Sequence, residues 1–271
     1  MRPISFLSDF GLADEFVGVV HGVIARIEPE LRVIDVTHQI PRGDVRAGAL
    51  ALLRAVQYLP DGVVLAVVDP GVGTGRRAIA AETGRGYFVG PDNGLLAPAV
   101  AMVGGAHRIV SLEDERFRLP SDGATFEGRD VFAPAAAVLA SGEASPDDLG
   151  PEVDPESITP LLLPLVGRRD DSAEGEVWWI DVYGNAQTNV SPADLAALGL
   201  REGDEVDVRI GPDIHRLRWQ RTFGAADEAG GMLVVDGSGL IALSVPGERA
   251  DRRYRLASGT SVVFTPPTAA G

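Results

Sequence analysis

The sequence predicts an N-terminal α/β domain with a mostly parallel sheet, followed by a smaller, barrel-like C-terminal domain of β-strands. Three observations predict this fold class. Strand-like apolar runs alternate with helical patterns in the first half, proline is frequent in the middle, and short alternating segments fill the second half. A chain of 271 residues is long enough for two cores. We therefore predict domains at 1–150 and 175–271, joined by a linker at 151–174.

The first half opens with an apolar run at residues 3–8, which is typical of a buried strand. Apolar residues then recur at helical spacing from Phe16 to Ile27, until Pro29 stops the pattern. Strands separated by helices predict a parallel sheet. Further strand or helix patterns follow at 31–36, 45–58, 63–68, 79–82, 87–89 and 130–140.

The second half consists of short segments separated by Gly, Pro and Asp, which predicts a small all-β domain. One short helix interrupts it, with Ser191 as N-cap, Pro192 at the first helical position and Gly199 near its end. The predicted strands are 177–182, 206–210, 215–219, 233–235, 240–245 and 261–264.

Composition excludes several classes of function. The formal charge of −15 argues against nucleic acid or an anionic membrane surface as a partner, because both require a positive field. All 24 basic residues are arginine and cysteine is absent, which excludes Schiff-base, thiolate and disulfide chemistry. No apolar run is long enough to span a membrane, so a cytoplasmic protein that acts on a small molecule is expected.

Two carboxylates, Asp9 and Asp69, follow apolar runs and are expected at the carboxyl edge of the sheet, where ligands bind in open α/β folds. Such a pair can hold a divalent metal, accept hydrogen bonds from a sugar diol, or act as a general base. The glycine-rich segment 67–77 fits neither a phosphate loop nor a dinucleotide fingerprint. It allows Arg76 to fold back toward Asp69.

Residues 180–189 combine a carboxylate, an aromatic ring and amides around a glycine. An Asx turn at Asp181 explains much of this pattern. The alternative is functional: Asn185 can pair with a purine edge while Tyr183 offers a stacking face.

The four histidines are scattered and lack zinc-site spacing, so we interpret them as structural or surface residues and expect no metal. The four histidines are His21, His38, His107 and His215. We expect no cofactor either.

Together, these motifs resemble the S-adenosylmethionine hydroxide adenosyltransferases, the hydrolase relatives of fluorinase and chlorinase. The resemblance covers nearly the whole chain in the family's order. It implies cleavage of S-adenosylmethionine to adenosine and methionine, and a homotrimer with active sites at subunit interfaces. The motifs are SDFGLADEF (8–16), IDVTHQI (34–40), VDPGVGTGRR (68–77), GPDNGLL (90–96), TFEGRDVFAPAAA (125–137), IDVYGNAQTN (180–189) and TF (222–223).

The resemblance implies a role for each matching residue. Asp9 accepts hydrogen bonds from both ribose hydroxyls, while Asp14 and Asp181 face the ammonium and sulfonium end of methionine. Asn185 binds the adenine edge. The remaining implied substrate contacts are Phe16, Gly128, Tyr183, Phe223, Ser238, Val245 and Gly247.

Reaction class is implied by two positions. Asp69 stands where the halogenating relatives have a tyrosine, and Gly128 stands where fluorinase has a fluoride-binding serine, so the chain resembles the hydrolases. The implied catalytic set is Asp69, Arg76 and Glu127, although the family hydrolases carry histidine in place of Glu127. Residues 236–242 also replace the family's NSxGYLE pattern at the methionine end.

Three alternatives remain open from the sequence. An adenosyl halogenase would differ only in its nucleophile, and halogenated deoxyadenosine would reveal it. A nucleoside-binding protein that lost catalysis with the histidine would bind without turnover. A metal-dependent hydrolase, suggested by the carboxylates alone, would lose activity in chelator.

Overall fold

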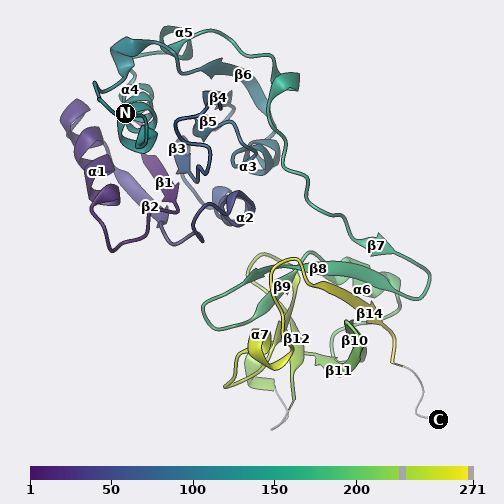
Figure 1. The fold of residues 1–271 in the computed structure, drawn as a ribbon. Coiled ribbons are helices and arrows are strands. Elements are labelled where there is room, and N and C mark those ends of the chain that lie inside the picture. Colours follow the sequence, from purple (N-terminus) through teal and green to yellow (C-terminus); the bar gives the residue numbers. More distant parts are fainter. Residues whose placement is uncertain (226–229, 268–271) are drawn as a thin grey trace. The chain divides into compact units, whose positions relative to one another are not determined.

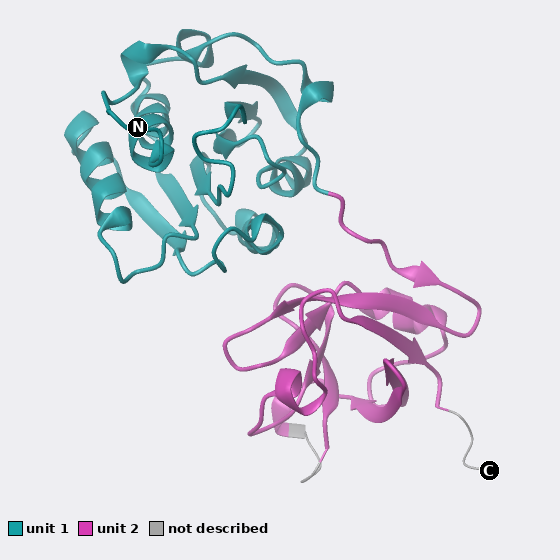
Figure 2. Ribbon diagram, viewed as in Figure 1, with its two compact units in different colours: residues 1–161 teal, residues 162–271 magenta. Residues whose placement is uncertain are grey.

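The computed structural model describes residues 1–225 and 230–267 (Figure 1). Contacts divide the chain into two compact units, Met1–Leu161 (unit 1) and Leu162–Gly271 (unit 2), coloured separately in Figure 2. This division falls within the segment predicted as a linker. Unit 1 is α/β and unit 2 contains a β-barrel, which confirms the predicted fold class.

Unit 1 is built on a six-stranded sheet with the order β2-β1-β3-β5-β4-β6. The strands β2, β1, β3 and β5 pair in parallel, and β4 is antiparallel to both β5 and β6, so only β4 is reversed. The mostly parallel sheet is thereby confirmed. The strands are β1 Ile4–Ser8, β2 Val33–Thr37, β3 Gly62–Val67, β4 Ala78–Thr83, β5 Gly86–Pro91 and β6 Ala106–Ser111.

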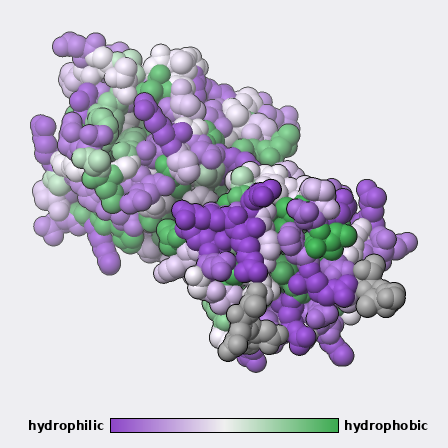
Figure 3. Space-filling model, turned by 60° about the horizontal axis from the view of Figure 1, so that its bottom comes forward, coloured by the Kyte–Doolittle hydropathy of each residue, from purple (hydrophilic) through white to green (hydrophobic). Residues whose placement is uncertain are grey.

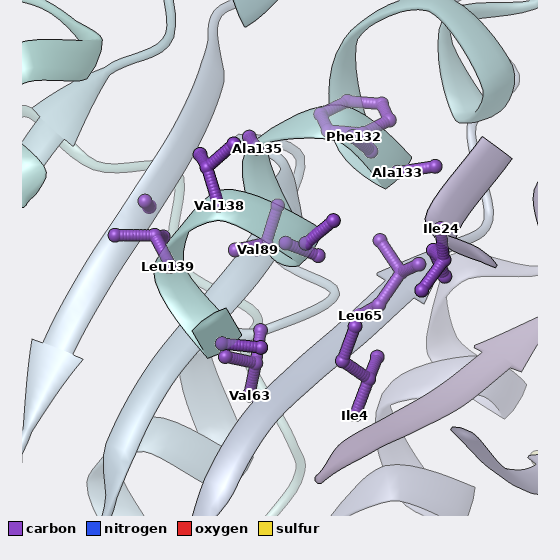
Figure 4. Packing of buried hydrophobic residues seen from close by; sticks show 14 of the residues in the cluster. Ile4, Ile24, Val63, Leu65, Val89, Phe132, Ala133, Ala135, Val138 and Leu139 are labelled. Atoms are coloured by element: carbon purple, nitrogen blue, oxygen red, sulfur yellow. The ribbon is translucent and has the colours of Figure 1, made fainter. Parts of the chain in front are cut away.

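Helices cover both faces of this sheet. Figure 4 shows side chains of α4 meeting those of β1, β3 and β5, with Ile24 of α1 beside them. Every residue of α4 from Ala133 to Ala140 is buried, so this helix has no polar face. The helices are α1 Phe16–Ile27, α2 Val45–Val56, α3 Ala97–Met102, the π-helical turn η2 Gly128–Phe132, α4 Ala133–Ser141 and α5 Pro146–Leu149, with 3₁₀ turns η1 Glu115–Phe117 and η3 Pro155–Ser157.

The proline-rich segment after α5 is partly bound to unit 1. Arg77 Nε and Nη2 donate to the buried carboxylate of Asp92 at 2.9 and 2.6 Å, and Arg77 Nη1 donates to Ser157 Oγ at 2.9 Å. The other oxygen of Asp92 accepts from Thr159 N at 2.8 Å. These contacts hold the chain to unit 1 almost as far as Leu161.

Unit 2 is a closed barrel of seven strands in the order β14-β10-β11-β12-β13-β9-β8, closed by pairing of β14 with β8. Closure removes the exposed sheet edges of the seven strands. The two-residue strand β7 pairs antiparallel with β8 and is not one of the seven barrel strands. The elements are β7 Gly167–Arg168, β8 Ala173–Ile180, β9 Ala186–Thr188, α6 Pro192–Ala197, β10 Glu205–Ile210, β11 Asp213–Trp219, η4 Phe223–Ala225, β12 Met232–Val235, β13 Ile241–Ser244, α7 Ala250–Arg253 and β14 Ser261–Thr265.

Helix α6 begins as predicted, with Ser191 as N-cap and Pro192 at its first position. A capping box is formed because Asp194 accepts from Ser191 N at 2.8 Å and Ser191 Oγ at 2.6 Å, while Arg168 Nε donates to its other oxygen at 2.6 Å. Burial by itself raises the pKa of Asp194, but the hydrogen bonds from Ser191 and Arg168 outweigh burial and hold the pKa below its ordinary value.

We expect Asp194→Ala to lower the free energy of unfolding by about 2–3 kcal/mol near pH 7, since it removes a cap and charge-assisted hydrogen bonds. A carboxylate whose pKa is lowered by folding stabilises above its unfolded pKa, so the loss should shrink as pH falls below about 4 and through the lower pKa of the folded state. Urea unfolding at several pH values measures this. The exposed Asp170→Ala is the control, and an equal effect of both substitutions would contradict the prediction.

Elements with little apolar periodicity were missed by the sequence. These are α3, α5, β6, β7, β9 and α7, each of six residues or fewer, and β7 lies inside the segment predicted as a linker. Short elements depend on tertiary contacts, because so few residues give no clear period.

The surface carries both hydrophilic and hydrophobic residues. The face in Figure 3 is mostly hydrophilic, with smaller hydrophobic areas between. Among the residues that the structure describes, no helix combines the length and apolar character needed to cross a membrane.

Candidate active site

Three of the predicted catalytic side chains meet in unit 1. Arg76 Nε donates to Asp69 Oδ1 at 3.2 Å, and its Nη2 bonds both Asp69 Oδ2 and Glu127 Oε2. The guanidinium therefore lies between two carboxylates, and its side chain is only 9% exposed. The glycine-rich loop suggested that Arg76 folds back toward Asp69, and the family resemblance placed Glu127 in the same set and suggested its pairing with Arg76. The structure shows both contacts.

The environment of Asp69 favours the protonated form more than water does. Burial raises the pKa of Asp69 above its ordinary value, the charge of Glu127 adds to this, and Arg76 with the Gly71 amide only partly offsets it. A carboxylate with a raised pKa is a better acceptor for a proton near neutral pH. The guanidinium of Arg76 already occupies the space between Asp69 and Glu127. The arrangement therefore favours proton transfer over metal binding at the Asp69 carboxylate.

Asp9 lies at the same sheet edge as Asp69. Ser8 of β1 is opposite Val67 of β3, so the residues that follow both strands leave the sheet side by side. Asp9 N donates to Val67 O at 3.3 Å, and Asp9 Oδ2 accepts from Gly43 N at 2.7 Å. The parallel register thus explains why two carboxylates 60 residues apart share one edge.

Glu127 directly precedes the π-helical turn η2. Such turns occur often at functional sites because the extra residue redirects neighbouring side chains. A Cβ at Gly128 would lie 2.8 Å from the Phe10 ring, so the structure leaves no room there for a larger residue without movement of that ring.

The rings of Phe10, Phe16 and Phe126 pack edge to face around this turn, with centroid distances of 5.1 to 6.1 Å. Phe16 is 38% exposed at the start of α1. Asp14, in the loop before α1, is exposed as well. Phe16 and Asp14 therefore remain accessible within unit 1.

A second group of predicted residues lines a pocket of about 580 Å³ in unit 2. Tyr183 and Phe223 are 76% and 53% exposed, and both rings line this one pocket, which makes it a candidate binding site. The pocket thus gathers five predicted substrate contacts from distant parts of the sequence. Its lining is Tyr183, Asn185, Phe223, Val245, Pro246, Gly247, Glu248 and Arg249.

The turn that carries Tyr183 and Asn185 is organised by Asp181. Asp181 Oδ1 accepts from Tyr183 N and Asn185 N, both at 2.9 Å, and Oδ2 accepts from Asn185 Nδ2 at 2.8 Å. The Asx turn considered from the sequence is therefore present. In this structure the carboxylate of Asp181 orients the amide of Asn185.

Sequence reasoning missed Arg249, which secures the same turn. Arg249 Nη1 donates to Val182 O at 2.8 Å, and its Nε and Nη2 pair with Asp251 at 3.0 Å. Gly184 has φ +89°, and a Cβ there would lie 2.6 Å from Arg249 Cβ. Glycine is thus required where Arg249 packs on the turn, a signal that single-residue patterns do not carry.

Ser238 is not among the residues that line the pocket. It lies on the exposed tip between β12 and β13, where Asp236 Oδ1 accepts from Ser238 N at 2.8 Å and from Leu240 N at 3.0 Å. Its predicted role at the methionine end stays a prediction.

Comparison with known families matches both the N-terminal and the C-terminal part of the chain. Residues 4–150 match the SAM hydroxide adenosyltransferase N-terminal domain, and residues 175–263 match the C-terminal domain of the same family. The chain belongs to the SAM hydroxide adenosyltransferase family.

Relatives support the same assignment. The (R)-S-adenosyl-L-methionine hydrolase of Salinispora arenicola is 48% identical over 265 residues, covering 97% of each chain. The fluorinase of Nocardia brasiliensis is more distant, at 27% identity over 96% of each chain. The crystal structure of an uncharacterized conserved protein from Thermotoga maritima superposes with a TM-score of 0.90 at 32% identity, covering 97% of this chain and 99% of that one.

Proposed function

We propose that this adenosyltransferase-family protein hydrolyses S-adenosyl-L-methionine to adenosine and L-methionine. The observation that carries the proposal is the partly buried Asp69–Arg76–Glu127 set in a chain 48% identical to a named (R)-S-adenosyl-L-methionine hydrolase. The second support is the pocket in unit 2, whose exposed rings and amide suit an adenine.

In the proposed reaction, a water oxygen bonds to the ribose 5′ carbon as the bond from that carbon to sulfur breaks. The bonding electrons stay on sulfur, which leaves as a neutral thioether and needs no general acid. Asp69 accepts the proton of the attacking water, and Arg76 fixes the direction of its carboxylate. Positioning of the water in line with the leaving sulfur supplies much of the rate.

Substrate binding is assigned to the remaining predicted residues. Tyr183 and Phe223 would stack on the adenine ring, and Asn185, oriented by Asp181, would bind its polar edge. Asp9 would accept hydrogen bonds from the ribose diol, since its two oxygens match two adjacent hydroxyls.

A product assay tests the function. We expect purified protein to form adenosine and methionine from S-adenosylmethionine in water labelled with heavy oxygen, with the label in the adenosine 5′ hydroxyl. Because the relatives are named for the (R) form, both sulfonium epimers should be assayed separately. Halogenated deoxyadenosine formed in the presence of halide, or binding without turnover, would overturn the proposal.

The surroundings of Gly128 argue against a fluoride site of the fluorinase type. A serine at this position would press against the Phe10 ring, since even its Cβ would lie 2.8 Å away. The packing around Gly128 therefore agrees with the absence of that serine, while the choice of water as nucleophile rests on the similarity to named hydrolases.

Glu127→His tests the position where the chain departs from the family's histidine. The charge of Glu127 raises the pKa of Asp69, so removing that charge should lower this pKa and move the acid limb of kcat to lower pH. Adenosine affinity should change less than about threefold, because Glu127 belongs to the catalytic set. Measurements of kcat against pH and calorimetry with adenosine would check both.

Glu127→Gln is the matched control for that substitution. It removes the same charge without adding an imidazole, so its acid limb should move in the same direction. An acid limb that stays in place in both variants would show that Glu127 does not influence Asp69.

We also propose that the protein acts as a homotrimer with active sites at subunit interfaces, as the resemblance implies. Sedimentation velocity measures the assembly. If neighbouring copies share each site, Asp69→Asn and Tyr183→Ala chains refolded together should regain part of the turnover that each lacks alone. A monomer, or no recovery in mixed assemblies, would contradict this proposal.

A further inference from the structure

Two of the four histidines lie together with a carboxylate, outside the site described above. His21 is on α1, while Asp35 and His38 are on and just after β2. Asp35 Oδ1 lies 2.8 Å from His21 Nε2 and 3.1 Å from His38 Nε2. The ligand atoms of all three residues lie within 4.8 Å of one another.

From this cluster we propose that His21, Asp35 and His38 form a binding site for a divalent transition-metal ion of the zinc class. Two ligand atoms that each lie about 2.1 Å from one zinc ion are about 3.0–3.4 Å apart. The two distances to Asp35 Oδ1 are close to this range. Two imidazoles and one carboxylate suit zinc, cobalt or nickel better than magnesium or calcium.

His38 is the best-defined ligand of the three. Its side chain is only 3% exposed, and its Nδ1 lies 2.8 Å from Ser8 Oγ, the contact that orients a metal-binding imidazole in many sites. Among described residues, Nε2 of His38 is buried without a hydrogen-bond partner. With the proton on Nδ1, a lone pair on Nε2 faces the carboxylate of Asp35, and a bound cation satisfies both.

The other two ligands can adjust to an ion. The side chains of His21 and Asp35 are 35% and 46% exposed, so small movements and water can complete the coordination. The carboxylate of Asp35 supplies an oxygen ligand that a divalent ion can bind together with the two imidazoles.

The site is connected to the loop that carries Asp9. Ser8, which contacts His38, also accepts from Phe10 N at 3.3 Å, and His38 O accepts from Gly11 N at 2.7 Å. A metal ion would join α1 to β2 and fix His38, and through it the loop on both sides of Asp9. Its role would be structural, since the proposed proton transfer belongs to Asp69.

Calorimetry with tag-free, chelator-treated protein tests the site. We expect one Zn²⁺ to bind per chain, to raise Tm, and to be replaced by Co²⁺ with a visible absorption spectrum typical of nitrogen and oxygen ligands. Mg²⁺ and Ca²⁺ should neither bind at this site nor raise Tm. Absence of saturable Zn²⁺ binding would overturn the proposal.

Variants locate the binding. His21→Ala and Asp35→Asn alter partly exposed ligands, so both should fold, yet bind Zn²⁺ at least about tenfold more weakly and lose the Tm rise. His107→Ala, which removes an exposed histidine elsewhere in unit 1, is the matched control and should bind as the unaltered chain does. Equal binding by His21→Ala and His107→Ala would show that the ion binds elsewhere.

Discussion

Replacing Asp69 by asparagine should lower kcat by about 10²–10⁴-fold, the usual contribution of a positioned general base. Asparagine keeps the shape of the side chain and an oxygen that can accept from Arg76 Nε, but it cannot take a proton from water. Adenosine should bind with little change, because the residues proposed to hold adenine lie in unit 2. Turnover by product chromatography and binding by calorimetry measure the two effects separately.

The matched control is Asp122→Asn, the same substitution at an exposed position of unit 1. It should leave both turnover and binding unchanged. Unchanged turnover in Asp69→Asn would show that another group accepts the proton. The pH profile of the unaltered protein gives a second check, since a raised pKa at Asp69 places the acid limb of kcat above the ordinary aspartate range.

Arg76→Met should have the second-largest effect, lowering kcat at pH 7 by about 10²-fold or more through loss of alignment and of charge. Two carboxylates would remain without the cation between them. Their repulsion and burial both raise the pKa of Asp69, and the protonated form is inactive. The acid limb of kcat should therefore move to higher pH, so part of the activity returns as pH rises.

Arg76→Lys separates charge from geometry. Lysine keeps the positive charge but lacks the planar fork that binds two carboxylates, so the pH shift should be smaller than in Arg76→Met while kcat stays low. Urea unfolding should show a loss of about 3 kcal/mol for the methionine variant, because a buried ion pair loses one partner. An acid limb that does not move in Arg76→Met would refute the pairing.

Much of the fold could be predicted from long, strongly patterned segments. The helix from Phe16 to Ile27 was predicted with both ends correct, because its apolar spacing is regular and Pro29 follows it. The helix expected at 130–140 begins instead as the π-helical turn η2. No sequence period distinguishes such a turn from an α-helix, and the turn here begins at Gly128, beside the packed rings of Phe10 and Phe126.

Pairings across the chain could not be predicted in the same way. Closure of the barrel by β14 and β8 joins strands about 90 residues apart, and alternation alone does not specify partners. The lining of the unit 2 pocket could not be predicted either. Arg249 lines it because Gly184, which has no side chain, allows Arg249 to pack closely on the turn. These features depend on contacts between residues that no local pattern links.

The sequence alone determined the fold class, the family resemblance and the chemical character of the candidate groups, because these follow from periodicity, composition and ordered motifs. Only the tertiary structure decided which groups meet. It placed Arg76 between Asp69 and Glu127, and it brought His21 to Asp35 and His38. The physical reason is that side-chain distances, burial and pKa are set by how strands and helices pack, and packing joins residues that the sequence keeps far apart.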